Sequence, residues 1–199
     1  MLTNKFKINY SIGSIANGIK TDTFTFFLLF FYSNIIGLKP ALAGLAIFIA
    51  LCVDAVTDPL MGTISDRTKS SLGRRHPYML ISFIPMSLGY VFLFAPRQDW
   101  DMSQNDLFIW MTIFTVLTRI GMTLFDIPHR AFGGEITKNY KERTLLMSWR
   151  EMVGWVAGLS NAFLGYGIFF ASTPEYPQGQ LNPDAWFPFA VTGAIFMIL

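Results

Sequence analysis

Six long apolar segments, separated by short polar breaks, limit this chain to a fold that crosses a membrane. A spanning helix needs about 20 predominantly apolar residues. Segments that reach or approach this length cover residues 8–36, 40–65, 78–95, 106–135, 145–172 and 185–199. Each break contains Pro, Gly or a polar cluster, which favours a turn. Only 14% of the residues are charged, against about 25% in soluble domains. The sequence therefore predicts an all-α membrane protein whose single domain, residues 1–199, is a six-transmembrane-helix bundle.

Positively charged residues are concentrated on one side of the expected bundle. The N-terminus and the second and fourth breaks carry Lys5, Lys7, Arg67, Lys69, Arg74, Arg75, Lys138, Lys141 and Arg143, whereas the other breaks carry Lys39 and Arg97. Short loops rich in Lys and Arg stay in the cytoplasm. We therefore expect a multi-pass protein of the cell membrane (a bacterial inner membrane), surrounded by lipid, with a cytoplasmic N-terminus. The basic residues form no patch, and nucleic acid is not an expected partner.

The sixth segment ends at Leu199 without a polar flank or a basic anchor. A natural C-terminus usually leaves the hydrocarbon before it ends, so we expect a truncated chain. A genuine six-helix protein with a short last helix is the alternative.

Two aspartates one helical turn apart, Asp54 and Asp58, interrupt the second apolar segment. A carboxylate at the centre of a spanning helix costs roughly 2.5–3.5 kcal/mol, and two at positions i and i+4 also repel each other. Pro59 follows Asp58, and a proline inside a helix frees a backbone carbonyl. The pattern predicts a site for a cation, Na⁺ or H⁺. Two separately paired aspartates are the alternative, although this segment contains no Lys or Arg.

Charged residues of two further segments lie at a similar depth. With a rise of about 1.5 Å per residue, Asp58, Asp126 and Arg150 lie roughly 9–14 Å from the expected cytoplasmic end. Charged side chains inside a membrane usually face the bundle interior or a watery cavity. We therefore expect these segments to share a binding site. A salt bridge between Asp126 and Arg150 that only fixes helix packing is the alternative.

Other polar residues in the apolar segments have simpler interpretations. Arg119 and Arg130 are expected to pair with neighbouring carboxylates, and Lys20 either extends to the membrane surface or contributes to the site. His129 is expected to be hydrogen-bonded, with a proton relay as the alternative.

Four stretches of the sequence resemble one known family. Residues 54–62 and 65–77 are similar to the second helix and following loop of the glycoside–pentoside–hexuronide:cation symporters, a branch of the major facilitator superfamily. Residues 126–144 resemble the end of that family's fourth helix, and residues 30–38 the end of its first. The likeness runs through all six segments at matching spacing.

The resemblance implies a twelve-helix transporter of two six-helix halves, with this chain as the N-terminal half and the sugar and cation held between the halves. The C-terminal half is then the expected partner. No cofactor is expected besides the coupling cation, whose implied ligands are Asp54, Asp58 and Thr123.

Residues in three helices correspond to the family's sugar-binding positions. The first-helix carboxylate of the family aligns with Gly18, which leaves its neighbour Asn17, and Asp22 one turn later, as candidates. Arg130 stands where the family has an aromatic sugar-stacking residue, so the substrate is expected to differ from a galactoside. The implied substrate-binding residues are Asn17, Asp22, Asp126 and Arg150.

The break after the second segment resembles the superfamily's gating loop between helices two and three. Its glycine allows close helix approach, and its arginines lock the cytoplasmic face by pairing with acidic helix ends. The implied gating residues are Asp66, Arg67, Gly73, Arg74, Arg75 and Glu135.

The leading expectation is cation-coupled symport of a sugar or glycoside by alternating access. One alternative is a major facilitator transporter of an amphiphilic lipid- or drug-like substrate. Another is a six-helix intramembrane enzyme, which needs a nucleophile such as Ser160 beside His129. Those two residues are expected at different depths, which argues against the enzyme.

Overall fold

The computed structural model describes residues 2–198, and within that range the chain forms helices and no strands. The α-helices are α1 (Asn4–Ile12), α2 (Ile15–Asp22), α3 (Leu28–Phe30), α4 (Pro40–Arg67), α5 (His76–Ile81), α6 (Phe83–Leu93), α7 (Gln104–Ile136), α8 (Tyr140–Leu164) and α9 (Trp186–Ile198). Three π-helical turns, η1 (Thr23–Phe27), η2 (Phe31–Ile35) and η4 (Gly165–Phe169), extend α2, α3 and α8. Short 3₁₀ turns lie at η3 (Gln98–Trp100), η5 (Gly179–Leu181) and η6 (Pro183–Ala185).

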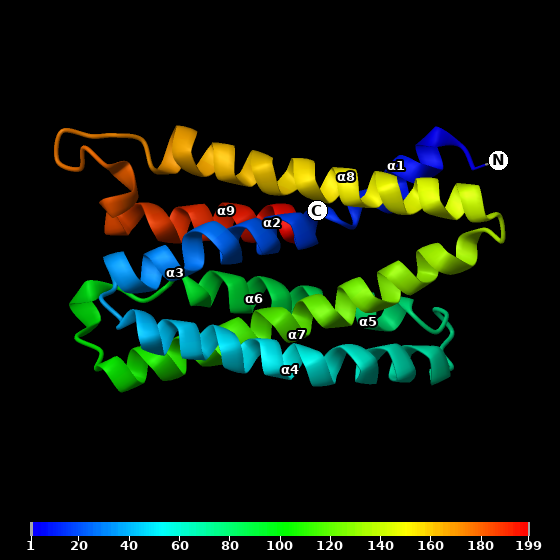
Figure 1. Ribbon diagram of the computed structural model, residues 1–199, viewed down its shortest axis with the longest axis horizontal. Helices are drawn as coiled ribbons and strands as arrows, with labels where there is room; N and C mark the ends of the chain where they lie inside the picture. The colour runs from blue at the N-terminus through cyan, green and yellow to red at the C-terminus, as the bar shows by residue number, and fades with distance from the viewer. Residues whose placement is uncertain (1, 199) are drawn as a thin grey trace.

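The helices run side by side along the long axis of the molecule (Figure 1). On one side, α7 packs against α4 and α6; on the other, α2 packs against α8 and α9, and α6 contacts α9 between them. The N-terminus, the α4–α5 connection and the α7–α8 connection lie at the same end (Figure 1). The three segments rich in Lys and Arg therefore share one end of the bundle.

Local signals explain why the helices begin where they do. Pro40 opens α4, where its missing N–H is not needed. Ser103 and Asp106 form a capping box at the start of α7. Asn139 caps α8 by accepting a hydrogen bond from the backbone N–H of Glu142. The helix begins at Tyr140 and not at the expected position 145. The expected start was late because the first turn of α8 is polar and was counted with the preceding break.

The first span differs from the single helix expected at 8–36. It breaks after Ile12, at Gly13, and contains two π-helical turns further along. A Cβ on Gly13 would lie 2.8 Å from Nε2 of His129, so the break brings the first span close to α7. Beside the break, the Ser14 hydroxyl donates to the Arg150 carbonyl at 2.6 Å. Contacts with distant helices, which local sequence does not encode, thus determine this geometry.

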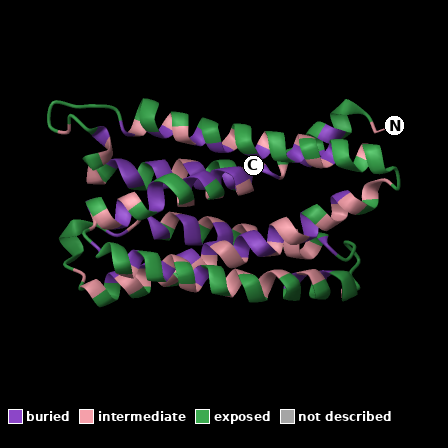
Figure 2. Cartoon of the chain, in the orientation of Figure 1, coloured by how far each residue is buried: buried purple, intermediate pink, exposed green. Residues whose placement is uncertain are grey.

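Four helices in the described range are long and apolar enough to cross a membrane: Pro40–Arg67, His76–Leu93, Gln104–Ile136 and Tyr140–Phe169. Pro183–Ile198 is a shorter apolar helix, and position 199 of the expected sixth segment lies outside the described residues. Large apolar side chains such as Phe48, Ile84 and Phe163 are exposed. Exposed residues line the outer faces of the helices, and buried ones face inward (Figure 2). This is the pattern expected of a bundle in lipid.

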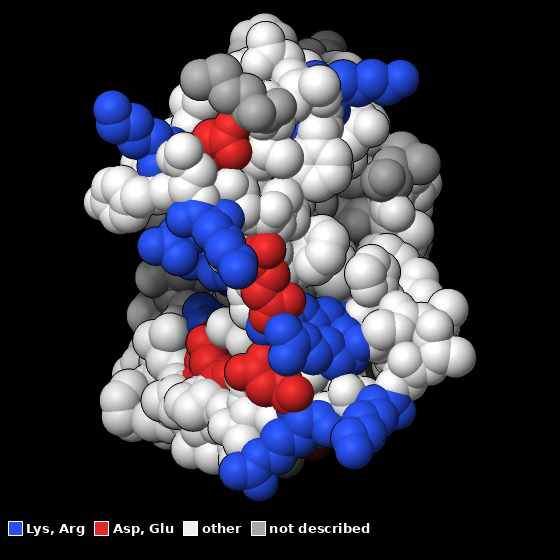
Figure 3. All heavy atoms as spheres, turned by 90° about the vertical axis from the view of Figure 1, so that its right-hand side faces the viewer, with Lys and Arg blue, Asp and Glu red and all other residues white. Residues whose placement is uncertain are grey.

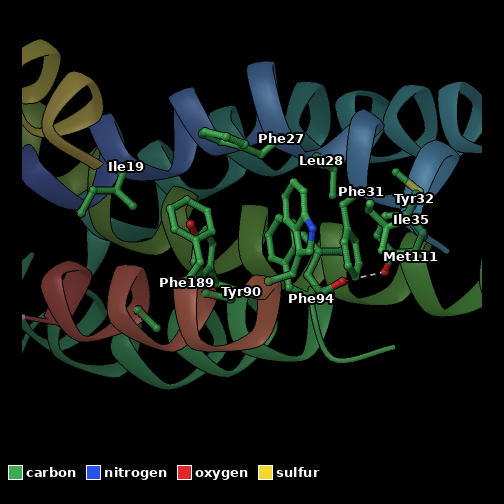
Figure 4. Packing of buried hydrophobic residues seen from close by; sticks show 14 of the residues in the cluster. Ile19, Phe27, Leu28, Phe31, Tyr32, Ile35, Tyr90, Phe94, Met111 and Phe189 are labelled. Carbon is green, nitrogen blue, oxygen red and sulfur yellow. Dashed lines mark hydrogen bonds between the residues drawn. The ribbon is translucent and has the colours of Figure 1, made fainter. Parts of the chain in front are cut away.

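An aromatic cluster joins the first span to α6 and α9. Figure 4 shows Phe27, Phe31 and Phe94 among the packed side chains. The ring of Trp186 stacks on Phe94 with centroids 6.1 Å apart and planes 10° apart. Offset stacks and edge contacts of this kind stabilise packing beyond the area that they bury. The cluster fixes the first span against α6 and α9.

The close approach of α2 and α8 depends on glycine. A Cβ on Gly18 would collide with the backbone carbonyl of Gly154. We expect Gly18→Ala to force the helices apart, at a cost of about 1–3 kcal/mol, and to lower the thermal unfolding midpoint of the purified protein. Gly44→Ala in α4 is the control, because no atom lies within 4 Å of its added Cβ. Equal stability of the two variants would contradict the close packing.

Candidate functional site

A polar cavity of about 70 Å³ lies between α2, α4 and α7. Its lining residues are Asn17, Lys20, Asp54, Asp58, Arg119, Met122, Thr123, Asp126 and Ile127. Among the predicted site residues, the three implied cation ligands, Asn17 and Asp126 thus meet in one place. Lys20 lines the same cavity, and its contribution to the site stays a prediction.

The two aspartates of α4 have different partners in this cavity. Asp54 forms an ion pair with Arg119 of α7, which confirms the expected pairing of that arginine. Asp58 accepts a hydrogen bond of 2.7 Å from the Thr123 hydroxyl. No ion pair to Asp58 forms among residues 2–198. The alternative of two separately paired aspartates therefore holds for Asp54 alone, and Asp58 has a hydroxyl but no bonded cationic partner in the described chain.

Asp126 joins the cavity to a second charged group. Its carboxylate pairs with Arg150 of α8 and with Arg130 one turn along α7, where the N–O distance is 2.6 Å. The Arg150 side chain is 1% exposed and also binds Glu151 at 2.6 Å. The salt bridge between Asp126 and Arg150 that was considered as a packing contact is therefore present, and Asp126 lines the cavity as well. Arg150 is not a lining residue and acts on the cavity through Asp126.

His129 connects the first span to this charged group. Nε of Arg150 donates to Nδ1 of His129 at 3.4 Å, so Nε2 carries the ring proton and donates to the Tyr10 carbonyl at 3.1 Å. The Tyr10 hydroxyl donates to the His129 carbonyl at 2.9 Å, and the two rings stack with centroids 4.4 Å apart. His129 is therefore hydrogen-bonded, as expected, and outside the cavity lining.

Asp22, like Arg150, is a predicted substrate-binding residue that does not line the cavity. Its side chain faces α8, where a Cβ on Gly158 would lie 2.6 Å from its carboxyl carbon. The residue is 4% exposed and does not line the cavity. Asp22 lies five residues after Asn17, so the helix turns its side chain away from α4. Direct contact of Asp22 with a substrate in this cavity is not supported.

Nearby, the sequence analysis missed a buried polar network. The Asn161 amide donates to the Thr23 hydroxyl at 3.2 Å, and that hydroxyl bonds with the Tyr90 hydroxyl at 2.7 Å. It joins the first span to α6 and α8. Asn161, an amide side chain inside the apolar α8, was the signal in the sequence that could have revealed this network.

Most of the predicted gating residues meet at one end of the bundle. The buried guanidinium of Arg75 donates to Asp66 at 2.8 Å and to Glu135 at 2.6 Å, which ties α4 to the end of α7. Arg74 also pairs with Glu135, and this hydrogen bond raises the pKa of the Arg74 guanidinium above its ordinary value. Gly73 has φ +86°, a conformation that favours glycine. Acidic and basic side chains alternate on this face (Figure 3).

Arg67 does not join this group. It is the last residue of α4, its side chain is exposed, and it makes no ion pair in the described part of the chain.

The cavity contains few ligands for a metal cation. Within residues 2–198, no three His, Cys, Asp or Glu side chains come together in a way that could hold one. Two carboxylates and a hydroxyl, those of Asp54, Asp58 and Thr123, are the oxygens that the implied cation site offers. The assignment of these residues to a cation stays a prediction.

Comparisons with known proteins match almost the whole chain. Residues 9–199 match the family described as MFS/sugar transport protein. The chain is 34% identical to the uncharacterized symporter sll1374 of Synechocystis sp., over 88% of this chain and 33% of that protein. It is 32% identical to the Escherichia coli inner membrane symporter YicJ, over 82% of this chain and 35% of that protein. For the E. coli putative glycoside/cation symporter YagG the identity is 31%, over 88% of this chain and 44% of that protein. The chain thus spans less than half the length of these relatives.

The buried ion pair between Arg150 and Asp126 makes a strong stability prediction. Arg150→Gln leaves Asp126 and Glu151 without this cation, and losing one partner of a buried pair costs about 3–5 kcal/mol. Adding Asp126→Asn to that variant should recover part of the loss. Arg130→Gln is the matched control: that side chain is half exposed, and an i,i+4 pair contributes about 0.3–0.5 kcal/mol. Thermal unfolding of the four proteins measures the coupling, and equal losses for Arg150→Gln and Arg130→Gln would contradict it.

Proposed function

This chain belongs to the MFS/sugar transport protein family, and from that membership we propose that it is part of a secondary transporter that moves a sugar or glycoside together with a cation. Members of this family are transporters, so the intramembrane enzyme is set aside. The observation that carries the proposal is the cavity in which Asp58 faces Asp126 inside an apolar bundle.

The coupling cation binds at Asp58, with Thr123 beside it. The carboxylate is partly buried inside an apolar bundle, where the effective dielectric is lower than in water, so a cation there is attracted more strongly than in bulk solvent. The cation reduces the repulsion between Asp58 and Asp126, and Asp126, while held by Arg130 and Arg150, accepts hydroxyl groups of the substrate through its remaining lone pairs. Asn17 offers an amide to the same substrate from α2.

A second six-helix half completes the site. A transporter of this kind binds its substrate near the membrane midplane, between two repeats that rock against each other. The three relatives are two to three times as long as their matched portions, which supports a partner half in the same protein. We place the protein in a bacterial inner membrane with the N-terminus in the cytoplasm, because the Lys- and Arg-rich segments share one end of the bundle.

The ion pairs around Arg75 close the cytoplasmic end. They hold α4, the following loop and α7 together at the end where the two halves part when the transporter opens inward. This end is held by exposed or half-exposed carboxylates around one buried guanidinium, an arrangement that opens at modest cost.

Asp58→Cys tests the cation site. We expect this variant of the full-length protein to reach the membrane and to lose cation-stimulated uptake, because no other carboxylate in the cavity is without an ion-paired partner. Asp99→Cys, in an exposed loop, is the control and should transport normally. Uptake in vesicles with and without a cation gradient gives the measurement. Unchanged stimulation in Asp58→Cys would contradict the assignment.

The substrate class needs its own test. Unlabelled sugars and glycosides, added in excess to vesicles, should compete with uptake driven by the cation gradient. Competition by lysolipids alone would favour the amphiphilic substrate instead.

Glu135→Gln tests the closed end. We expect it to weaken the hold of Arg75 and to speed thiol labelling of a Ser65→Cys variant several-fold, because Ser65 is buried beside this group. Cys52→Ser removes the exposed native thiol. Glu175→Gln, in an exposed loop between α8 and α9, serves as the matched control. The account of gating fails if both variants label at the same rate.

A further inference from the structure

One of the two carboxylates in the expected cation pair is already occupied by a cation of the protein itself. Arg119 donates from Nη1 to Oδ2 of Asp54, and both groups line the cavity. We propose that Arg119 is a tethered competitor of the coupling ion: while it holds Asp54, a metal cation has Asp58 as its one carboxylate ligand. This proposal builds on the proposed function and assigns Arg119 as the residue that sets cation affinity.

The pair is held by a single bond and is incompletely satisfied. An arginine and a carboxylate often form two parallel hydrogen bonds, but Oδ1 of Asp54 and Nε of Arg119 are buried without a hydrogen-bond partner in the described chain. The guanidinium also lies over the Phe24 ring, 5.5 Å from its centroid, so a cation–π contact holds it besides the Asp54 carboxylate. A partly exposed pair with unsatisfied atoms is one that a small cation can displace.

The rest of the lining does not replace the lost ligand. A hard cation prefers a shell of several oxygens, and Asp126 is held by Arg130 and Arg150. The helix α4 runs through Pro59 without an unwound turn, so it does not offer the row of free carbonyls found at the broken helices of other transporters. Removing Arg119 would return both oxygens of Asp54 to the cavity.

Charge acts in the same direction. The charged groups that face Asp58 are Lys20 from α2, Asp54 on its own helix, and Arg119 and Asp126 from α7. Lys20 and Arg119 are both positive, and at close range inside a protein like charges repel strongly. Without Arg119 the cavity loses one positive charge, so its net charge becomes more negative and its attraction for Na⁺ rises.

The test is Na⁺ binding to the purified full-length protein, by isothermal titration with NaCl against choline chloride. We expect Arg119→Gln to bind Na⁺ at least about tenfold more tightly than the unchanged protein, which is about 1.4 kcal/mol. Arg97→Gln, which removes an exposed arginine at the other end of the bundle, should bind as the unchanged protein does. Unchanged or weaker Na⁺ binding by Arg119→Gln would overturn the proposal.

A charge-neutral double variant keeps the proposal testable if Arg119→Gln does not fold. Asp54→Asn with Arg119→Gln removes both members of the pair and should bind Na⁺ as the unchanged protein does, because Asp54 is not an available ligand in either. A large loss of Na⁺ affinity in the double variant would show that Asp54 ligates the ion beside Arg119, against the proposal. Binding is measured without a substrate, so the result stands even if no sugar is transported and the proposed function fails.

Discussion

Compensation of charge inside an apolar bundle is the constraint on which this structure depends. A lone ion is too costly in such surroundings, and the acidic side chains of α4, α7 and α8 accordingly find basic or hydroxyl partners. Asp54 meets Arg119, Asp126 meets Arg150, and Asp58 meets the Thr123 hydroxyl. These contacts join α4 to α7 and α7 to α8, so the same interactions that make the charges tolerable also fix how the helices face one another.

The three aspartates of the cavity are held to different degrees, and this difference determines where a cation can bind. The buried Arg150 guanidinium binds Asp126 and Glu151 and is joined to the first span through His129, so Asp126 is held firmly. The Arg119 pair is single and leaves buried atoms unsatisfied. Asp58 has a hydroxyl and no bonded cation. A mobile cation entering the cavity therefore meets three different carboxylates. Asp58 has no bonded cation, Asp54 is held by a single bond to Arg119, and Asp126 is held by two arginines.

Apolar length and charge placement predict much of this arrangement from the sequence. Segments of sufficient length and the depth of Asp58 and Asp126 were enough to predict a bundle with a shared polar site. The break at Gly13 was not predictable, because it depends on the fit of the first span against His129. The placement of Asp22 outside the cavity was not predictable for a related reason: local spacing does not say which neighbour a helix face meets, and here that neighbour is Gly158. Arg119 pairs with Asp54 and not with Asp58 because of how α4 and α7 are rotated about their axes, which the sequence does not show.

The central claim is that substrate and cation move through this cavity together. The most direct measurement is cation entry into de-energised vesicles containing the full-length protein when a sugar gradient alone is imposed. The account predicts that sugar entering down its gradient carries the cation inward. Sugar entry at an undiminished rate with no movement of Na⁺ or H⁺ would contradict it.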